Sequence, residues 1–410
     1  MENKRISVSK INTKRIIVAS FALIICGVFA WYLLSPSFSK VEYNSPAVNG
    51  VEQSNVPATN IAPIVTNAVV EIPVTHIKTP EHVKSVYISA WTAGGPKFLS
   101  PITKLIDSTE LNAVVIDVKD STGRVSFHSS NAELEKIGSP EKRIPDIKAL
   151  TTLLHQKNIY IIGRIAVFQD PYLTKVKPEW SITRKSDGKV WKDRKGLSFL
   201  DPSKKEVYDY IATVAKEAYS VGFDELNFDY IRYPSDGNIK DINYHLVEGK
   251  TKADNIEAFF KYLSADLKKE QNIPISADLF GLTTEATDDM GIGQVWEKAL
   301  PYFDFLCPMV YPSHYPPGQD GFKNPNLHPY EIINIALTSA IKKTKAMNEN
   351  ISKIRPWLQD FNLGAVYTPE MVSAQMKAVY DNGLNSWMLW DPANKYSSAS
   401  NGALKLETIQ

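Results

Sequence analysis

The chain has 410 residues and a formal net charge of +1, with 46 Lys and Arg against 45 Asp and Glu. This near balance argues against a nucleic-acid partner, because proteins that bind polyphosphates usually carry a clustered basic surplus. Its two cysteines, Cys26 and Cys307, fall in an N-terminal apolar run and in a predicted strand, so no disulfide is expected within the folded domain.

The N-terminus has the pattern of a membrane anchor. Residues 1–15 form a basic segment with Lys or Arg at five positions, and residues 16–34 form an uncharged apolar run. A helix over this run would be roughly 28 Å long, close to the hydrocarbon thickness of a bilayer. The positive flank predicts a cytoplasmic N-terminus and export of everything after the run. A cleaved signal peptide is the alternative, but the run lacks a small-x-small site at its end. We therefore expect an uncleaved single-pass anchor in the cell membrane.

Three more segments follow the anchor. Residues 35–80 read as a linker, because six prolines lie there among Ser, Asn, Val and Thr without helical periodicity. Residues 81–396 form the folded domain, and residues 397–410 are a short tail. The linker is expected to hold the domain away from the membrane, on the extracytoplasmic side.

Short apolar strands alternate with amphipathic helices through the folded domain. Eight strands in this βα alternation, with no central break, predict an α/β fold of the (β/α)8 TIM-barrel type. No glycine-rich phosphate loop follows the first strand, which disfavours an open nucleotide-binding sheet. The expected strands are Val86–Trp91, Ala113–Lys119, Tyr160–Val167, Glu225–Tyr230, Ile275–Phe280, Phe305–Tyr311, Arg355–Asp360 and Ser386–Asp391. The clearest helices are Ser203–Ser220, Asp254–Gln271, His328–Met347 and Thr368–Asn382, and little chain remains for an eighth helix.

Polar side chains recur at the ends of these strands, where barrel enzymes place their active sites. Carboxylates are costly to bury, so their recurrence at nearly every strand end predicts an acidic barrel mouth. The candidate substrate-binding residues at or near strand ends are Asp117, Lys119, Asp120, Arg164, Asn227, Arg232, Tyr311, Gln359, Trp390 and Asp391.

Strand parity singles out two aspartates. On the fourth strand Asn227 and Asp229 share one face, and on the fifth strand Ser276 and Asp278 do so. Asp229 and Asp278 are then neighbours that point into the mouth. Glycoside hydrolysis needs such a pair, one carboxylic acid to protonate the leaving oxygen and one carboxylate to attack carbon or activate water. The alternative is that either aspartate forms a structural ion pair with Arg164, Arg232 or Lys119.

Aromatic residues near the strand ends are candidates for sugar contacts. Trp91 and Trp390 could lie beneath a sugar ring, and Tyr311 and His314 belong to a Pro-rich loop that could line a subsite. Core packing is the alternative for both tryptophans.

Several motifs resemble one family of barrels. The segment from Gly222 to Pro234, GFDELNFDYIRYP, resembles the fourth-strand motif of glycoside hydrolases related to the alpha-amylase-like barrels. The segments 86–91, 115–120 and 307–315 are similar to the glycosyl hydrolase family called domain of unknown function 4015, and the resemblance covers roughly residues 84 to 395. It implies that Asp229 is the fourth-strand nucleophile or base and Asp278 its acid partner. Related barrels often carry Glu on the fifth strand, so Glu285 in the next loop is a second candidate for the acid.

Other chemistries have little support in the sequence. None of the seven histidines falls on a predicted strand, so neither a metal site nor any other cofactor is expected. No Gly-x-Ser-x-Gly elbow appears either. The sequence therefore predicts an anchored, exported hydrolase that cleaves a glycosidic bond in a cell-surface or extracellular polysaccharide. A non-catalytic glycan-binding barrel of the cell envelope is the alternative.

Overall fold

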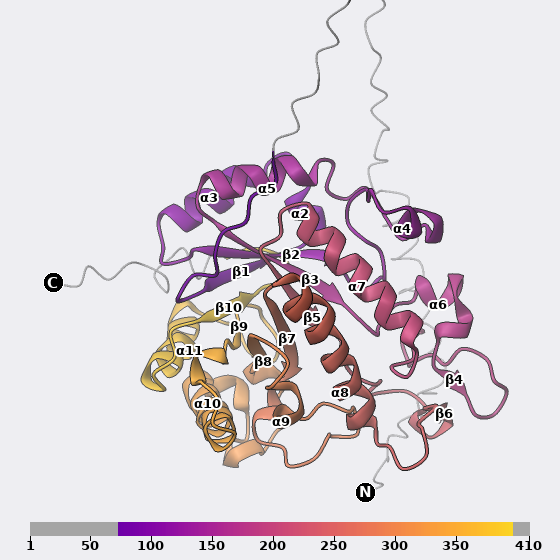
Figure 1. The fold of residues 1–410 in the computed structure, drawn as a ribbon. Helices are drawn as coiled ribbons and strands as arrows, with labels where there is room; N and C mark the ends of the chain where they lie inside the picture. The colour runs from indigo at the N-terminus through magenta and orange to yellow at the C-terminus, as the bar shows by residue number, and fades with distance from the viewer. Residues whose placement is uncertain (1–72, 397–410) are drawn as a thin grey trace, which may run out of the picture. The chain divides into compact units, whose positions relative to one another are not determined.

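The computed structural model describes residues 73–396, in which eight parallel strands close into a barrel surrounded by helices (Figure 1). Around the barrel the strands follow the order β1-β10-β9-β8-β7-β5-β3-β2. They are β1 (Lys84–Ile88), β2 (Ala113–Lys119), β3 (Tyr160–Ala166), β5 (Glu225–Asp229), β7 (Ile275–Phe280), β8 (Phe305–Met309), β9 (Trp357–Gln359) and β10 (Trp387–Trp390). Each overlaps a predicted strand, and the closed barrel confirms the predicted fold.

Long helices cover the outside of the barrel, and short ones lie in the loops. The long helices are α3 (Leu99–Asp107), α5 (Ile147–Gln156), α7 (Lys205–Ser220), α8 (Lys252–Leu263, continued by a π-turn over Ser264–Lys269), α10 (Pro329–Ala346) and α11 (Pro369–Asp381). The short ones are α2 (Ala90–Ala93), α4 (Ala132–Ile137), α6 (Leu173–Val176) and α9 (Trp296–Ala299). Two short strands in long loops, β4 (Thr183–Arg184) and β6 (Ile242–Asn243), pair antiparallel.

Local sequence accounts for where the helices begin and end. Thr368 accepts a hydrogen bond from the amide of Met371, and Pro369 occupies the first turn of α11, where its missing N–H costs nothing. After α7 the chain turns sharply at Gly222, whose φ is +106°. A Cβ on Gly222 would lie 2.6 Å from the Thr151 hydroxyl, so the turn into β5 requires glycine.

Alternation along the strands separates an apolar outer layer from a polar interior. On β5, Leu226 and Phe228 are buried in the main apolar cluster, while Asn227 hydrogen-bonds across the interior to Ser276 of β7. This confirms the predicted parity of both strands. Tyr230 is an exception, since β5 ends at Asp229 and Tyr230 adopts a φ of +52°.

The first strand ends earlier than predicted. Ser89 accepts a hydrogen bond from the amide of Thr92, so it caps α2 and places Trp91 on that short helix. The Trp91 side chain is 63% exposed and stacks against the guanidinium of Arg143. The prediction that Trp91 lies on the first strand is therefore wrong, because a serine N-cap converts the end of the apolar run into a helix.

The described residues end shortly after the last strand. No helix follows β10 within residues 391–396, in agreement with the short chain left there. Instead the hydroxyl of Tyr396 donates a hydrogen bond to the carbonyl of Tyr87 on β1.

The predicted basic segment, the anchor over residues 16–34, most of the linker and the tail lie outside the described residues. Within residues 73–396 no helix is long and apolar enough to cross a membrane.

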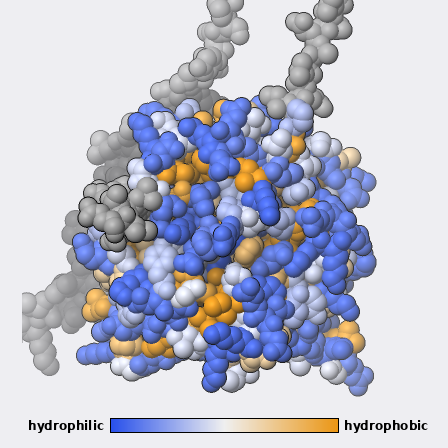
Figure 2. All heavy atoms as spheres, turned by 60° about the vertical axis from the view of Figure 1, so that its left-hand side comes forward, coloured by the Kyte–Doolittle hydropathy of each residue, from blue (hydrophilic) through white to orange (hydrophobic). Residues whose placement is uncertain are grey.

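The surface of the described domain is mostly hydrophilic. Figure 2 shows one face, on which hydrophobic side chains gather only in small groups among hydrophilic ones. Scattered exposed apolar residues are normal for a folded domain, so this face offers no extended apolar surface.

A buried ion pair lies low in the barrel interior. The Nη1 of Arg355 donates to Glu225 Oε1 at 2.8 Å, and both side chains are 0% exposed. The same carboxylate accepts hydrogen bonds from the hydroxyls of Ser276 (2.6 Å) and Tyr160 (3.1 Å). The Arg355 guanidinium also lies 3.7 Å from the centre of the Phe305 ring. Each partner neutralises the other where neither can reach water.

Removing one partner of this pair should destabilise the fold strongly. We expect Arg355→Met to lower the free energy of unfolding by about 3–5 kcal/mol, because it leaves the Glu225 carboxylate buried without its cation. Urea unfolding followed by circular dichroism measures this. The control is Lys205→Met, which breaks an exposed pair with Asp209 and should cost about 1 kcal/mol or less. Equal effects of the two substitutions would contradict the assigned role of Arg355.

Candidate active site

A cavity of about 440 Å³ opens at the C-terminal ends of the barrel strands. This volume falls in the range of small-ligand sites, and the position is the one that barrel enzymes use. It is lined by Arg164, Asp229, Tyr230, Arg232, Asp278, Phe280, Gly281, Leu282, Met309, Tyr311, His314, Tyr315, Trp357 and Trp390. The structure thus brings together seven of the predicted candidates, Asp229, Asp278, Arg164, Arg232, Tyr311, His314 and Trp390.

Arg164 on β3 organises one side of this cavity. Its Nε and Nη2 donate to Asp229 Oδ2 at 3.1 and 2.5 Å, and its Nη1 donates to Asp117 Oδ1 at 2.7 Å. The second oxygen of Asp117 accepts a hydrogen bond from the Tyr87 hydroxyl at 2.6 Å. The two aspartates therefore share one guanidinium, which holds the Asp229 carboxylate in place.

Asp278 on β7 lies in a different environment. It is 1% exposed, and its Oδ1 accepts hydrogen bonds from Asn227 Nδ2 (2.8 Å) and Trp357 Nε1 (2.7 Å). No hydrogen bond to its Oδ2 is found within residues 73–396. Burial, followed by the negative charge of Asp229, raises the pKa of Asp278 well above its usual range, against the opposing effect of Arg164. This shift favours the protonated form of Asp278.

Aromatic rings form much of the remaining wall. Trp390 stacks on Tyr87 with ring centres 3.9 Å apart and meets Trp357 edge-on at 5.5 Å. The guanidinium of Arg164 lies 5.0 Å from the centre of the Trp390 ring. On the loop after β8, Tyr311 packs edge-on against His314 at 5.2 Å. Rings that are fixed by such contacts can offer flat apolar faces to a ligand.

The sequence reasoning missed several cavity residues. Trp357 was expected only as part of a strand, yet its indole N–H orients Asp278. Tyr230 was assigned to the apolar face, but its positive φ turns it into the cavity lining. A bulky residue in this backbone region is strained, and such residues cluster at functional sites. Strand parity places Trp357 on the same face as the predicted Gln359, but for Tyr230 it indicates the wrong face.

Two predicted site residues at the end of β2 lie outside the cavity. Lys119 is fully buried, forms an ion pair with Asp170 at 2.9 Å and donates a hydrogen bond to the carbonyl of Ala166. Asp120 forms an ion pair with Arg143 at 2.6 Å. A register shift between Asp117 and Lys119 interrupts the strand pairing there. Lys119 and Asp120 therefore hold the second loop in place.

Three more predicted residues also make structural contacts outside the lining. Asn227 lies between Asp278 and the Ser276 hydroxyl, and Asp391 accepts hydrogen bonds from the backbone of the turn after β10. Gln359 accepts a hydrogen bond from the amide of Ser313 and so fixes the loop that carries Tyr311. Asn227 and Gln359 act on the cavity through Asp278 and the loop of Tyr311, whereas Asp391 holds the turn after β10.

Glu285, the second candidate for the acid, lies beyond β7 and outside the cavity lining. Burial and the nearby charge of Asp320 raise the pKa of Glu285 to about 7. Its Oε1 is buried and has no hydrogen-bond partner within the described residues. Glu285 can therefore also carry a proton near neutral pH, which makes it the natural control in any test of Asp278.

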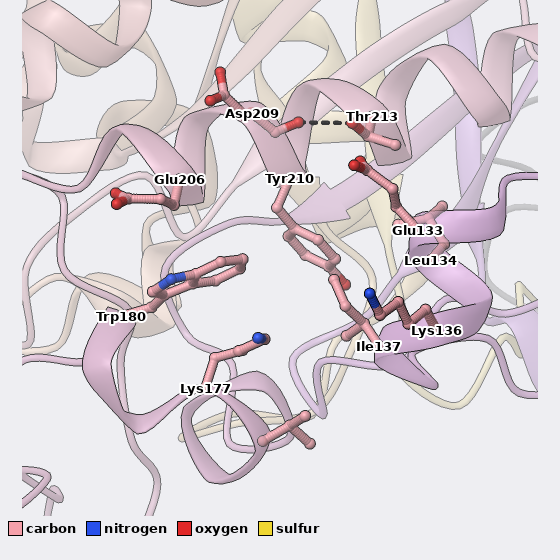
Figure 3. Close-up of a pocket in the computed structure, with 11 residues that line it drawn as sticks. Glu133, Leu134, Lys136, Ile137, Lys177, Trp180, Glu206, Asp209, Tyr210 and Thr213 are labelled. Atoms are coloured by element: carbon pink, nitrogen blue, oxygen red, sulfur yellow. Dashed lines mark hydrogen bonds between the residues drawn. The ribbon is translucent and has the colours of Figure 1, made fainter.

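Another hollow of comparable size lies away from the barrel mouth. It holds about 490 Å³ between α4, α7 and the segment that carries Lys177 and Trp180 (Figure 3). None of the predicted site residues lines it. Elsewhere in the described part of the chain, no group of three His, Cys, Asp or Glu side chains is arranged to hold a metal ion. The mouth cavity is therefore the candidate active site, because it alone combines the two strand-end carboxylates.

One of three solved structures compared with this chain shares the barrel fold with a TM-score above 0.5. The PgaB (BpsB) glycoside hydrolase domain from Bordetella bronchiseptica superposes with a TM-score of 0.56 at 14% identity, over 80% of this chain and 100% of that one. A hypothetical protein from Ruminiclostridium thermocellum is 32% identical over 50% of this chain and 98% of its own, with a TM-score of 0.43. The alpha-galactosidase TtGalA from Thermus thermophilus, solved with stachyose, gives a TM-score of 0.49 at 14% identity, over 80% of this chain and 65% of its own. No curated protein matches the chain.

A family comparison covers most of the chain. The model of DUF4015, described as "Putative glycosyl hydrolase domain", matches residues 85–396, which include every barrel strand except the first residue of β1. This match confirms the resemblance seen in the sequence motifs. The protein therefore belongs to the DUF4015 family of glycosyl hydrolase domains.

Proposed function

We propose that this protein is a membrane-anchored, exported glycoside hydrolase that cleaves a polysaccharide at or near the cell surface. One observation carries the proposal: two carboxyl groups in contrasting environments, Asp229 and Asp278, line one cavity at the C-terminal ends of the barrel strands. The family of the chain and the fold that it shares with a glycoside hydrolase domain support the same chemistry.

Asp229 is proposed as the nucleophile or general base. Arg164 donates two hydrogen bonds to its Oδ2, and the amide of Tyr230 donates one to its Oδ1 at 2.6 Å. These donors fix the orientation of the Asp229 carboxylate. In this orientation Asp229 can attack the anomeric carbon or take a proton from the attacking water.

Asp278 is proposed as the general acid. Its raised pKa keeps a proton on the carboxyl group, and Oδ2 is the oxygen free to hold that proton because Oδ1 already accepts two hydrogen bonds. The proton passes to the glycosidic oxygen as the bond between that oxygen and the anomeric carbon breaks. The leaving sugar then departs as a neutral alcohol.

The aromatic wall supports a sugar ligand. Trp390 and Tyr311 line the same cavity as the two aspartates, and both are held by ring contacts with their neighbours. An aromatic face packs well against the C–H face of a sugar ring. We propose that these rings position the sugars on either side of the cleaved bond.

A non-catalytic glycan-binding barrel remains the second candidate. The ion pair between Arg164 and Asp229 favours it, because a structural role for Asp229 predicts this same contact. The two candidates differ in what Asp229 contributes, since binding alone requires no turnover.

Replacing Asp229 tests the first candidate directly. We expect Asp229→Asn to lower kcat by at least about 10³-fold while the affinity for the glycan changes little, because only the nucleophile or base is lost. The assay measures reducing ends released from a panel of cell-wall and extracellular polysaccharides. Asp107→Asn, at an exposed position of α3, is the control and should leave turnover unchanged. Thermal melting checks the fold, and full turnover by folded Asp229→Asn would exclude the proposed role.

The pH dependence tests Asp278 as the acid. Because the reaction needs its protonated form, kcat should fall as the pH rises through the raised pKa of Asp278. Asp278→Asn should lose this alkaline limb and about 10²–10⁴-fold in kcat, with a smaller loss on aryl glycosides whose leaving groups need no proton. Glu285→Gln is the matched control. If Glu285→Gln instead removes the alkaline limb, the acid is Glu285.

The anchor over residues 16–34 is proposed from the sequence alone. We expect the full chain to sediment with membranes and to resist extraction by carbonate, because an apolar helix of this length is stable in a bilayer. A chain that begins at residue 73 should remain in the soluble fraction after expression in the cytoplasm. Protease added outside intact cells should digest the domain of the full chain; a domain protected until the cells are lysed would contradict the proposed orientation.

A further inference from the structure

Arg232 is a partly buried cation in the wall of the mouth cavity. It follows β5, the strand that carries Asp229, and its side chain lines the cavity together with both aspartates. Unlike Arg164, it forms no ion pair with any residue between 73 and 396. A cation in this position is costly to bury without an anion, so a ligand is the natural source of the missing charge.

The guanidinium of Arg232 keeps one edge free. Its Nη1 donates to the carbonyl of Tyr233 at 3.1 Å and to the Ser235 hydroxyl at 3.3 Å. Among the described residues neither Nε nor Nη2 has a hydrogen-bond partner. Neither atom is completely buried, so a ligand can reach both. The Nε–Nη2 edge is the side of arginine that matches two oxygens of a carboxylate, sulfate or phosphate group.

Two aromatic rings hold this guanidinium in place. Its carbon lies 4.7 Å from the centre of the Phe280 ring and 5.4 Å from that of Tyr230. Tyr230 is the residue with the strained positive φ, so the backbone turn after β5 brings its ring next to Arg232. A cation fixed between rings loses little rotational freedom when it binds an anion, because it is already ordered.

The carboxyl groups of the cavity are engaged with groups other than Arg232. Asp229 shares Arg164 with Asp117, and the raised pKa of Asp278 favours its neutral form. The carboxylates whose charges act on Arg232, which are Asp229, Asp236 and Asp193, form no ion pair with it. Arg232 therefore provides a positive charge in the lining that no protein carboxylate contacts.

We propose that Arg232 binds an acidic substituent of the sugar substrate, so that the enzyme acts on an anionic polysaccharide. The substituent is a carboxylate or sulfate group bound by the Nε–Nη2 edge. Arg232 is then a specificity residue that contacts the substrate beside the cleaved bond. This inference rests on the proposed function, because it names the substrate class of the same cavity.

Equilibrium binding to matched sugars tests the inference without requiring turnover. The full chain in detergent is titrated calorimetrically with three pairs of oligosaccharides that differ only in charge. The pairs are oligogalacturonate and its methyl ester, hyaluronan fragments before and after carboxyl reduction, and chondroitin sulfate fragments before and after desulfation. We expect about 10–100-fold tighter binding of the charged member in at least one pair, as for hydrogen bonds to a charged group. The first two pairs report on carboxylate, and the third reports on sulfate.

Three variants assign that preference to Arg232. Arg232→Gln should remove it, and Arg232→Lys, which keeps the charge but not the two-nitrogen edge, should retain only part of it. Arg184→Gln removes one exposed positive charge outside the cavity and should leave the preference intact. Melting temperatures confirm that each variant is folded, and Arg232→Lys serves in place of the glutamine variant if that variant does not fold.

The outcomes separate this inference from the proposed function. No preference for a charged member in any pair, or a preference that Arg232→Gln retains, overturns the inference. A preference that depends on Arg232 together with no hydrolysis of any sugar supports the inference and contradicts the hydrolase. Hydrolysis of neutral polysaccharides alone, with no effect of Arg232→Gln, supports the hydrolase and overturns the inference.

Discussion

Each polar side chain in the barrel interior needs a hydrogen-bond or ion-pair partner at its own height in the barrel. This constraint shapes the rest of the structure. Low in the barrel Arg355 neutralises Glu225. Above them Asn227 connects Ser276 to Asp278, and at the mouth Arg164 joins Asp117 to Asp229. Branched apolar side chains more commonly fill such barrels. Here each charge depends on the partner beside it, so the aspartates at the mouth are oriented by the layers that lie beneath them.

The same layers give the two mouth aspartates opposite properties. Asp229 receives hydrogen bonds from a cation, whereas Asp278 receives them from two neutral groups, the amide of Asn227 and the indole of Trp357. Neutral donors offset only part of the cost of burying the charged carboxylate, so the pKa of Asp278 rises. The negative charge of Asp229 raises it further. Two identical side chains thus lie in the contrasting environments that acid and base roles require.

Much of this arrangement follows from local rules that a sequence displays. The strand β7 was predicted with its observed bounds, and parity placed Asp229 and Asp278 on the interior face. The sequence could not separate Asp117, which contacts Arg164, from Lys119, which follows a register shift and pairs with Asp170. Which polar residue reaches a cavity depends on such partners, often from distant loops. Parity specifies only the face on which a side chain lies. The prediction for Trp91 was wrong for a different reason: Ser89 caps a short helix where the apolar run predicted a continued strand.

The position of Arg232 adds a constraint on how the cavity can work. Arg164 is shared by two carboxylates, and the positive charge of Arg232 lies in the same lining without touching that cluster. If Arg232 paired directly with Asp229, the carboxylate would be held by two cations and would be a weaker nucleophile and base. Holding Arg232 between Phe280 and Tyr230 keeps the two apart. The strained turn at Tyr230 therefore lets one short segment present both an anion for chemistry and a separate cation for recognition.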